Sequence, residues 1–499
     1  MRIGLVVDHP HRDLEGSVLL ARRLVARGGE PVLVPMYQQG IEQALLGLDA
    51  IVVNYYRPNT ASALRRWRAD GLATFVLDTE GGVLSESGHD SPPAFASALA
   101  RLHVADGVDG YLFWGEKLAR AVRDIGALPA ERIAVTGCPR FDLCAEPWRR
   151  RLGPRGADYV LINTNFSLIN PAQARGPGAE IATMIAGGWG KGYVVALVAD
   201  MRGVFGGYLA CLERIFAAFP RQRFRVRPHP FEDRSSYLER FARYGNVEVN
   251  GEGNVAAALR KATSVLHLNC GSAIEAALLD CTPVQLEFLN TPLQRAHAPL
   301  PARISRGVAT IDELASVLER PERLTEGFDI AAAVRRELAP YFGPLDGRAA
   351  DRAAEFIMTR LASLSRRRRT ASVFAGGGTR PGQVLQAALG AALGSAAVAR
   401  LREAMQPARR AKRLKAKRIS ALLAEFAACE PQAAGQALPT ARRARHRLSG
   451  LPLESILVEP AVASVAPGRR PRLPPACDGV GAGRQPLPSP TRAPHSQPR

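Results

Sequence analysis

The sequence predicts an α/β protein with two Rossmann-like domains that face a cleft, followed by a basic helical extension and a disordered tail. Three observations support this prediction. Short apolar runs alternate with helical segments over residues 1–345, the alternation breaks once at residues 137–157, and basic residues dominate after residue 360. Apolar runs separated by helices of about 10–15 residues are typical of parallel sheets covered on both faces.

The first domain is predicted at residues 1–136. Ile3–Val7 is an apolar run that ends at a polar loop, as expected of a buried parallel strand. Ser17–Arg27 has apolar residues at helical spacing and ends at Gly28, a glycine stop signal. The other predicted elements are strands at Pro31–Val34, Ala50–Val53, Ala73–Leu77, Gly110–Phe113 and Ile133–Thr136, and helices at Ile41–Leu46 and Ser62–Ala69.

Residues 137–157 are rich in Pro, Arg and Gly without periodicity, which predicts a linker. The alternation then restarts, and the second domain is predicted at residues 158–345. Because ligands bind at the carboxyl ends of strands in such sheets, we expect the loops that follow these strands to line the cleft. The predicted elements are strands at Tyr159–Asn163, Arg223–Val226, Asn246–Val249, Ser264–Leu268 and Val284–Phe288, and helices at Gly206–Ala218 and Ala273–Leu279.

The excess of basic residues belongs to the C-terminal part of the chain. Residues 361–499 hold 24 Lys/Arg and 6 Asp/Glu, whereas the first 360 residues hold 42 and 40. Residues 346–450 are therefore predicted to be a basic helical extension. Residues 451–499 contain 11 prolines and are predicted to be disordered.

Within the extension, Ala408–Ala428 combines many basic residues with apolar residues at helical spacing, namely Ile419, Leu422, Leu423 and Phe426. This pattern predicts a helix that lies on an anionic membrane surface. A solvated basic tail and a partner-binding helix are the alternatives. Few aromatic residues and no recognition fold accompany the charge, so no specific nucleic-acid partner is expected.

The seven cysteines are scattered without CxxC pairs or zinc-type spacing, which fits a reducing cytoplasm. The N-terminus lacks the pattern of a signal peptide, and no apolar stretch of bilayer-spanning length is recognised. We therefore expect a cytoplasmic protein, with peripheral binding to the inner membrane as a hypothesis. No DxD-like metal motif occurs in the predicted cleft loops, so no metal and no cofactor are expected.

Two acidic residues follow the strand Ala73–Leu77. Asp78 and Glu80 precede Gly81-Gly82, and the glycines would allow a substrate to come close. A carboxylate at this position can take a proton from an attacking hydroxyl group. Solvated acids and a helix cap are the structural alternative.

A second loop, Arg227-Pro228-His229-Pro230, follows another predicted strand. Its prolines restrict the backbone, and arginine and histidine can both bind a phosphate. A histidine satisfied within the loop is the alternative.

A third loop runs from strand to helix through Gly271 and Ser272. Its hydroxyl and backbone N–H groups can bind phosphate, and Glu275 can accept ribose hydroxyls. The Ser272–Glu275 spacing also fits a capping box, which is the structural alternative. Asn165 lies in a further polar loop, at Asn163–Phe166. Acids on one side of a cleft and phosphate-binding groups on the other side predict a two-domain glycosyltransferase.

The order of these motifs resembles that of the bacterial surface carbohydrate biosynthesis proteins, a GT-B-like family related to capsule polysaccharide, Kdo and sialic acid transferases. The matching strings cover roughly residues 1–345. They are Arg12-Asp13-Leu14, Leu77–Gly82, Val135–Asp142, Asn163–Phe166, Arg227–Pro230 and Gly271–Glu275.

The resemblance implies a metal-independent transferase that moves a sugar from a nucleotide donor, and it favours a CMP-sugar as that donor. The acceptor it implies is a surface polysaccharide or lipopolysaccharide, and a lipid-linked acceptor is one alternative. It implies Asp78 or Glu80 as the catalytic base, and His229 and Ser272 at the donor phosphate. We assign Arg227, Gly271, Glu275 and Asn165 to the same donor site. A nucleotide-sugar epimerase, a polyol-phosphate transferase and a non-catalytic nucleotide-binding scaffold are the alternatives.

Overall fold

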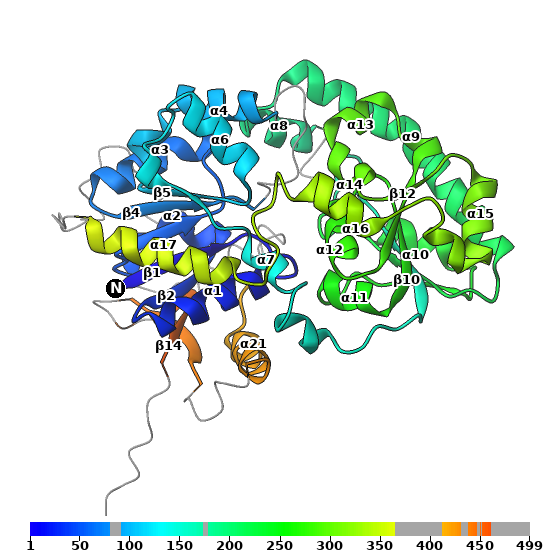
Figure 1. Cartoon of the computed structure of the whole chain (residues 1–499). Helices are drawn as coiled ribbons and strands as arrows, with labels where there is room; N and C mark the ends of the chain where they lie inside the picture. Colours follow the sequence, from blue (N-terminus) through cyan, green and yellow to red (C-terminus); the bar gives the residue numbers. More distant parts are fainter. Residues whose placement is uncertain are drawn as a thin grey trace, which may run out of the picture. The chain divides into compact units, whose positions relative to one another are not determined.

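The computed structural model describes residues 1–79, 91–172, 178–364, 412–430, 438–446, 450 and 452–460. Two sheets, one of eight strands and one of six, organise these residues (Figure 1). Within each sheet the βαβ connections pair the strands in parallel, and the antiparallel pairs involve only the hairpin near the C-terminus. The predicted fold class, two parallel α/β sheets with covering helices, is confirmed.

The first sheet has the strand order β13-β14-β2-β1-β3-β4-β5-β6. Its strands are apolar on both sides because helices cover both faces. The six parallel strands are β1 (Arg2–Val7), β2 (Glu30–Pro35), β3 (Ala50–Val53), β4 (Ala73–Leu77), β5 (Gly110–Phe113) and β6 (Ile133–Val135). One face packs against α1 (Leu14–Ala26), α17 (Ala349–Ser363) and α21 (Ala416–Ala428), and the other against α2 (Gln39–Leu45), α3 (Pro58–Ala69), α4 (Pro92–Arg101), α5 (Val104–Gly107) and α6 (Glu116–Asp124).

Helix α1 shows how local sequence sets these boundaries. Val18, Leu19 and Leu24 are fully buried against the sheet. The helix ends where Gly28 adopts a φ of 78°, a left-handed conformation that favours glycine. The predicted glycine stop is therefore confirmed.

The second sheet has the order β12-β11-β10-β7-β8-β9. Its strands are β7 (Tyr159–Asn163), β8 (Phe224–Arg227), β9 (Val247–Val249), β10 (Ala262–His267), β11 (Thr282–Leu286) and β12 (Arg306–Val308). Its helices include α8 (Ala179–Ala186), α9 (Lys191–Ala218), α10 (Ser235–Phe241), α11 (Val255–Lys261), α12 (Ser272–Leu278), α13 (Pro292–His297), α14 (Pro299–Arg303), α15 (Ile311–Glu319) and α16 (Ile330–Ala333). All five strands predicted for this domain are present, and β12 is an addition at one edge.

Helix α9 is longer than predicted. The sequence predicts a helix at Gly206–Ala218, whereas α9 begins at Lys191 and contains Gly192 and Gly203, which lower helix propensity. By length and composition α9 could cross a bilayer, which corrects the expectation that the chain has no such stretch. Core helices of soluble proteins can be equally long and apolar. Leu197, Tyr208 and Leu212 of α9 are buried in the core of the second sheet.

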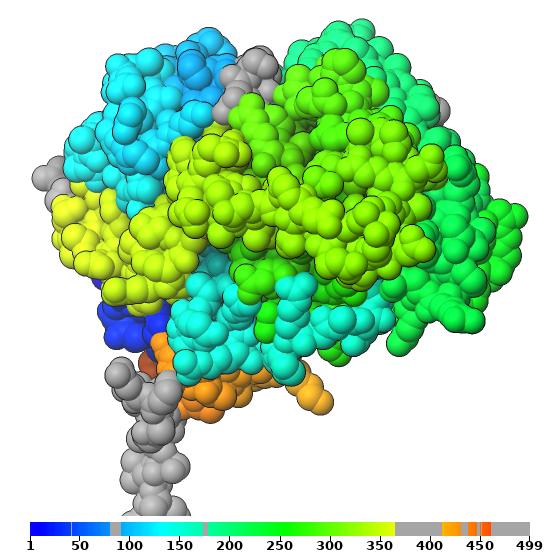
Figure 2. Space-filling model, turned by 45° about the vertical axis from the view of Figure 1, so that its right-hand side comes forward, coloured from blue at the N-terminus to red at the C-terminus, as the bar shows by residue number. Residues whose placement is uncertain are grey.

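The C-terminal extension differs most from the prediction. Ile419, Leu422, Leu423 and Phe426 of α21 are fully buried in the core of the first sheet, so they do not face a membrane. Figure 2 shows α21, in orange, lying against the cyan segment that contains η3 (Trp148–Leu152), and the rings of Trp148 and Phe426 are in edge contact at 5.7 Å. Helical spacing alone cannot distinguish an apolar face that meets lipid from one that meets protein. Residues 408–411 of the predicted helix lie outside the described residues.

Two strands follow α21. β13 (Thr440–Arg445) pairs with β14 (Pro452–Glu459), and β14 pairs antiparallel with β2, so that Ile456 lies opposite Leu33. Residues 452–459 therefore belong to the first sheet, whereas the sequence predicts disorder from residue 451. Residues 453–458 are all buried, including the apolar side chains of Leu453, Ile456, Leu457 and Val458, which explains why this segment forms a strand despite its proline-rich surroundings. The other predicted domain boundaries remain predictions.

Candidate active site

The loop after β4 contains the predicted acid Asp78. Its side chain is buried, with 5% of the residue exposed, and the hydroxyl group of Tyr111 on β5 donates a hydrogen bond to Oδ2 at 3.1 Å. Burial and the nearby carboxylate raise the pKa of Tyr111, so its hydroxyl group stays a donor. Glu80, the other predicted acid, lies outside the described residues.

Asp78 lines a cavity of about 50 Å³ at the carboxyl end of the first sheet. Strand ends, the first turns of α1 and the short helix α7 (Pro139–Asp142) form its wall. The polar lining residues are Asp13, Ser17, Asn54, Asp78, Thr79 and Arg140. This cavity is large enough for a hydroxyl group and too small for a whole nucleotide sugar.

The loop after β1 forms an ion-pair network in front of α1. Arg12 donates to Asp8 at 2.7 Å and to Asp13 at 2.9 Å. Burial alone would raise the pKa of Asp8, but Arg12 and Lys412 outweigh it and lower the pKa. Burial lowers the pKa of His9 to about 3, so this imidazole is neutral at physiological pH. The side-chain hydrogen bonds of Arg12 in the Arg12-Asp13-Leu14 motif thus stabilise the loop between β1 and α1.

In the second sheet, Arg227 ends β8. Its guanidinium donates to the carbonyl oxygens of Glu252 at 2.8 Å and Gly253 at 2.6 Å. These two bonds fix the loop beside β8. Contact between Arg227 and a donor phosphate remains a prediction.

His229 lies on a loop that hydrogen bonds hold in place. Its backbone N–H donates to Thr164 Oγ1 at 3.2 Å, and its ring Nδ1 accepts from the N–H of Phe231 at 3.3 Å. Three residues after His229, the buried carboxylate of Glu232 accepts hydrogen bonds from the Thr164 hydroxyl, the Phe166 N–H and the Tyr237 hydroxyl. Glu232 is not among the predicted site residues, and its only signal in the sequence is an acidic residue two positions after Pro230.

Ser272 is the first residue of α12, and Gly271 is the N-cap without a side-chain cap bond. Asn163 Nδ2 donates to Ser272 Oγ at 2.6 Å. The capping-box alternative is therefore wrong, because Ser272 is not the N-cap and Glu275 pairs with another residue. The Ser272 hydroxyl also lies 3.1 Å from Cys270 Sγ, and either of these two groups can donate the proton.

Asn165 supports the loop that carries Ser272. Its Nδ2 donates to the carbonyl oxygen of Asn269 at 3.3 Å. Asn269 has a φ of 47°, and its side chain bonds to Gln285 and Asn290. Left-handed backbone is strained for most residues and tolerated by asparagine. The hydrogen bond from Asn165 thus supports this loop.

Arg140 joins the two sets of loops. It lies on α7, stacks on the ring of Phe141 at 4.5 Å, and places Nε 3.3 Å from Glu275 Oε1 on α12. Because Arg140 lines the Asp78 cavity and Glu275 follows Ser272 by three residues, this pair connects the predicted base to the predicted phosphate loop. Arg140 lies within the Val135–Asp142 motif, and its spacing from Glu275 in the sequence gives no sign of this contact.

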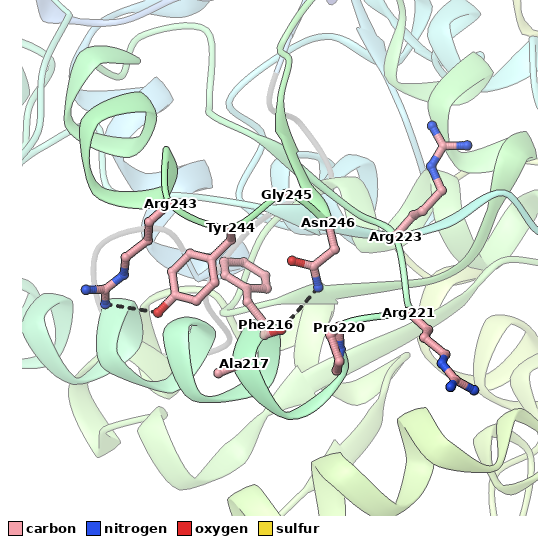
Figure 3. A pocket seen from close by; sticks show the side chains of 9 residues that line it. All are labelled: Phe216, Ala217, Pro220, Arg221, Arg223, Arg243, Tyr244, Gly245 and Asn246. Carbon is pink, nitrogen blue, oxygen red and sulfur yellow. Dashed lines mark hydrogen bonds between the residues drawn. The ribbon is translucent and has the colours of Figure 1, made fainter.

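A second hollow, of about 540 Å³, lies at the amino end of β8, away from the residues above (Figure 3). Arg243 bonds to Tyr244, and Asn246 bonds to the carbonyl oxygen of Phe216. Arg221 and Arg223 are exposed and point outward from the hollow in Figure 3. The residues that line this surface depression include no carboxylate and no histidine.

Among the described residues no three His, Cys, Asp or Glu side chains cluster in a way that could hold a metal ion. The predicted site residues thus fall into one acid cavity and one set of polar loops, with the roles assigned to them still predictions.

A scan against protein-family models finds no match, and a search of curated proteins finds no relative. Solved structures do match. An S. aureus MnaA–UDP co-structure is 13% identical, covers 73% of this chain and 97% of its own, and has a TM-score of 0.43. The Methanocaldococcus jannaschii UDP-GlcNAc 2-epimerase with UDP-GlcNAc and UDP is 12% identical, with coverages of 72% and 100% and a TM-score of 0.41.

The wall teichoic acid polymerase TagF, as a histidine-to-asparagine variant soaked with CDPG, is 10% identical to this chain. It covers 72% of this chain and 88% of its own, with a TM-score of 0.47.

Proposed function

We propose that this chain is a GT-B-type glycosyltransferase that moves a sugar from a nucleotide donor to a glycan acceptor. One observation carries the proposal: a buried carboxylate, Asp78, lines a small cavity that the Arg140–Glu275 pair connects to the Ser272 loop. An acid on one sheet and hydrogen-bond donors on the other are the two halves that glycosyl transfer requires.

In the proposed reaction, Asp78 accepts the proton of an acceptor hydroxyl group as its oxygen bonds to the anomeric carbon. The bond from that carbon to the donor's phosphate oxygen breaks, and the nucleotide leaves with the electron pair. His229, Arg227 and the Ser272 loop donate hydrogen bonds to the departing phosphate. Such donors stabilise developing charge without a metal ion, so activity should survive chelation of divalent metals.

The resemblance in the sequence motifs favours a CMP-sugar as donor and a surface polysaccharide or lipopolysaccharide as acceptor. Thermal-shift measurements with CMP, CDP, UDP and GDP test this choice. A ligand at about 100 times its Kd stabilises by about 2.7 kcal/mol, which is a readable shift. CMP or CDP should give the largest shift, and a response to UDP alone would favour an epimerase instead.

Asp78→Asn tests the base. The variant should bind nucleotide as the parent chain does, and transfer should fall by about 100-fold or more. Tyr111→Phe is the matched control, because it removes the hydroxyl donor and keeps the carboxylate. Nucleotide binding without turnover in the parent chain would favour the scaffold alternative, and unchanged transfer in Asp78→Asn would remove Asp78 as the base.

A further inference from the structure

The C-terminal extension contributes a buried cation between the loops of the two sheets. The Lys412 side chain is 8% exposed, and its Nζ donates to Asp8 Oδ1 at 2.6 Å. The same ammonium lies 4.9 Å from the ring centroid of Tyr37 and 5.1 Å from that of Phe231. Asp8 and Tyr37 follow β1 and β2, and Phe231 follows β8. One side chain from the extension thus contacts both sets of loops.

The segment after Lys412 is fixed to the first sheet. The apolar face of α21 is buried, and the carboxylate of Glu430 pairs with Arg22 and Arg23 of α1. In the strand β14, the N–H groups of Glu454 and Ser455 donate to the buried carboxylate of Glu42 at 2.8 and 2.9 Å. The position of Lys412 therefore follows from a chain segment that cannot shift independently of the sheet.

Burial of an ammonium group is unfavourable unless the charge is paired. Asp8 pairs it, and two aromatic faces add cation–π attraction. Arg12 also bonds to Asp8, but the same guanidinium bonds to Asp13, so Lys412 supplies the second positive charge for these two carboxylates. Without Lys412, Asp8 would still keep Arg12 as a hydrogen-bond partner.

The contact with Phe231 reaches a predicted donor-binding residue. Phe231 is 39% exposed, and its ring meets the edge of His9 at 5.4 Å. Its backbone N–H donates to the ring of His229. Lys412 and His9 therefore both contact the ring of Phe231, two residues after His229.

We propose that Lys412 is a positioning residue of the site. Its ammonium holds the loop of Phe231 and His229 against Asp8 and Tyr37, so the C-terminal extension completes the site between the two sheets. The proposal rests on the proposed transferase function for its kinetic readout, whereas the positioning of the loop has a readout of its own.

The test compares full-length Lys412→Met, Lys412→Arg and Lys417→Met. Methionine keeps the length of the side chain without the charge, and arginine keeps the charge. Lys417 is exposed on α21 and serves as the matched control. Hydrogen–deuterium exchange of the amides of His229, Phe231 and Glu232, nucleotide Kd, and kcat and KM for transfer are measured for each.

We expect Lys412→Met to exchange faster at these three amides with unchanged exchange in β1 and β4. A misplacement of about 1 Å can cost about 100-fold in rate, so its kcat should fall by about tenfold to 100-fold. Lys412→Arg should recover most of the rate, and Lys417→Met should match the parent chain. If Lys412→Met does not fold, Phe231→Leu removes the other partner of the contact and should show the same faster exchange.

Unchanged exchange and rate in Lys412→Met would overturn the proposal. So would equal losses in the methionine and arginine variants together with a lower Tm, because that result indicates a structural role only. If the parent chain binds no nucleotide, the proposed function fails, and the exchange data still decide whether Lys412 positions the loop.

Discussion

Arg140 Nε lies 3.3 Å from Glu275 Oε1, and this pair links a short helix after the first sheet to α12 of the second. Both side chains are largely buried, at 14% and 8% exposure. Within the described residues, Arg140 Nε and Glu275 Oε2 make no hydrogen bond. The attraction between the two side chains is thus largely electrostatic, so the loss of either one leaves a buried charge without its partner.

Replacement of either partner should destabilise the chain. Arg140→Met or Glu275→Gln leaves a buried polar group without its partner, at a cost of about 1–3 kcal/mol. The double variant should lose less than the sum, because contacting residues couple by about 0.5–3 kcal/mol. Urea unfolding of the four chains measures this coupling. Strictly additive losses would mean that the two residues act independently.

His229→Ala should weaken donor binding. Loss of a hydrogen bond to a charged phosphate costs about 1.5–3 kcal/mol, so Kd should rise by about tenfold to 100-fold. His229→Asn is the control, because its side-chain oxygen can accept from the Phe231 N–H as the imidazole does. Isothermal titration of nucleotide distinguishes the cases. Recovery of normal affinity by asparagine would assign His229 to loop shape alone.

Glu42 should make stability depend on pH. Burial raises its pKa from an ordinary value of 4.5 to about 7, even though Ser455 and Glu454 donate hydrogen bonds to it. The folded chain therefore binds the Glu42 proton more tightly than the unfolded chain. Its contribution to the free energy of unfolding is complete below pH 4.5 and is lost as pH rises through about 7.

Urea unfolding of the parent chain and Glu42→Gln between pH 4.5 and 8 measures this effect. One pKa unit corresponds to about 1.4 kcal/mol. The advantage of the parent chain over the variant should shrink toward pH 7 and then level off. Other titrating groups, such as Asp142, are common to both chains and cancel in the difference. An advantage that grows with pH would contradict the raised pKa.

Phe426→Ala should unfold the chain more easily, because the ring is fully buried against Trp148. Truncation of a buried phenylalanine costs about 3–5 kcal/mol. Lys417→Ala, on the exposed side of the same helix, should stay within about 0.5 kcal/mol. Thermal melts compare the two. A stable Phe426→Ala variant that pellets less with anionic liposomes would restore the membrane interpretation of α21.

The sheets were predictable because each parallel strand is a short apolar run between turn signals. Ile3–Val7 and Ala73–Leu77 correspond to β1 and β4 within one residue. The start of α9 was not predictable, since glycines interrupt its upstream half while buried residues such as Leu197 keep it helical.

The candidate site was predictable only as a set of loops. Asp78, His229 and Ser272 all follow strands, as parallel topology requires. Their contacts depend on residues far away in sequence, such as Arg140 for Glu275 and Lys412 for Asp8. A basic run gives no sign that one of its lysines is buried, because pairing across about 400 residues leaves no local pattern.

The pairing of β14 with β2 also affects how this chain is made. Ile456 meets Leu33, so the edge of the first sheet stays open until nearly the whole described chain has been synthesised. At about 5–20 residues per second, the nascent first domain exposes a strand edge and the apolar side of α1 on the order of tens of seconds. Open strand edges pair readily with other chains. Production of this protein should therefore be sensitive to the supply of chaperones that bind nascent chains.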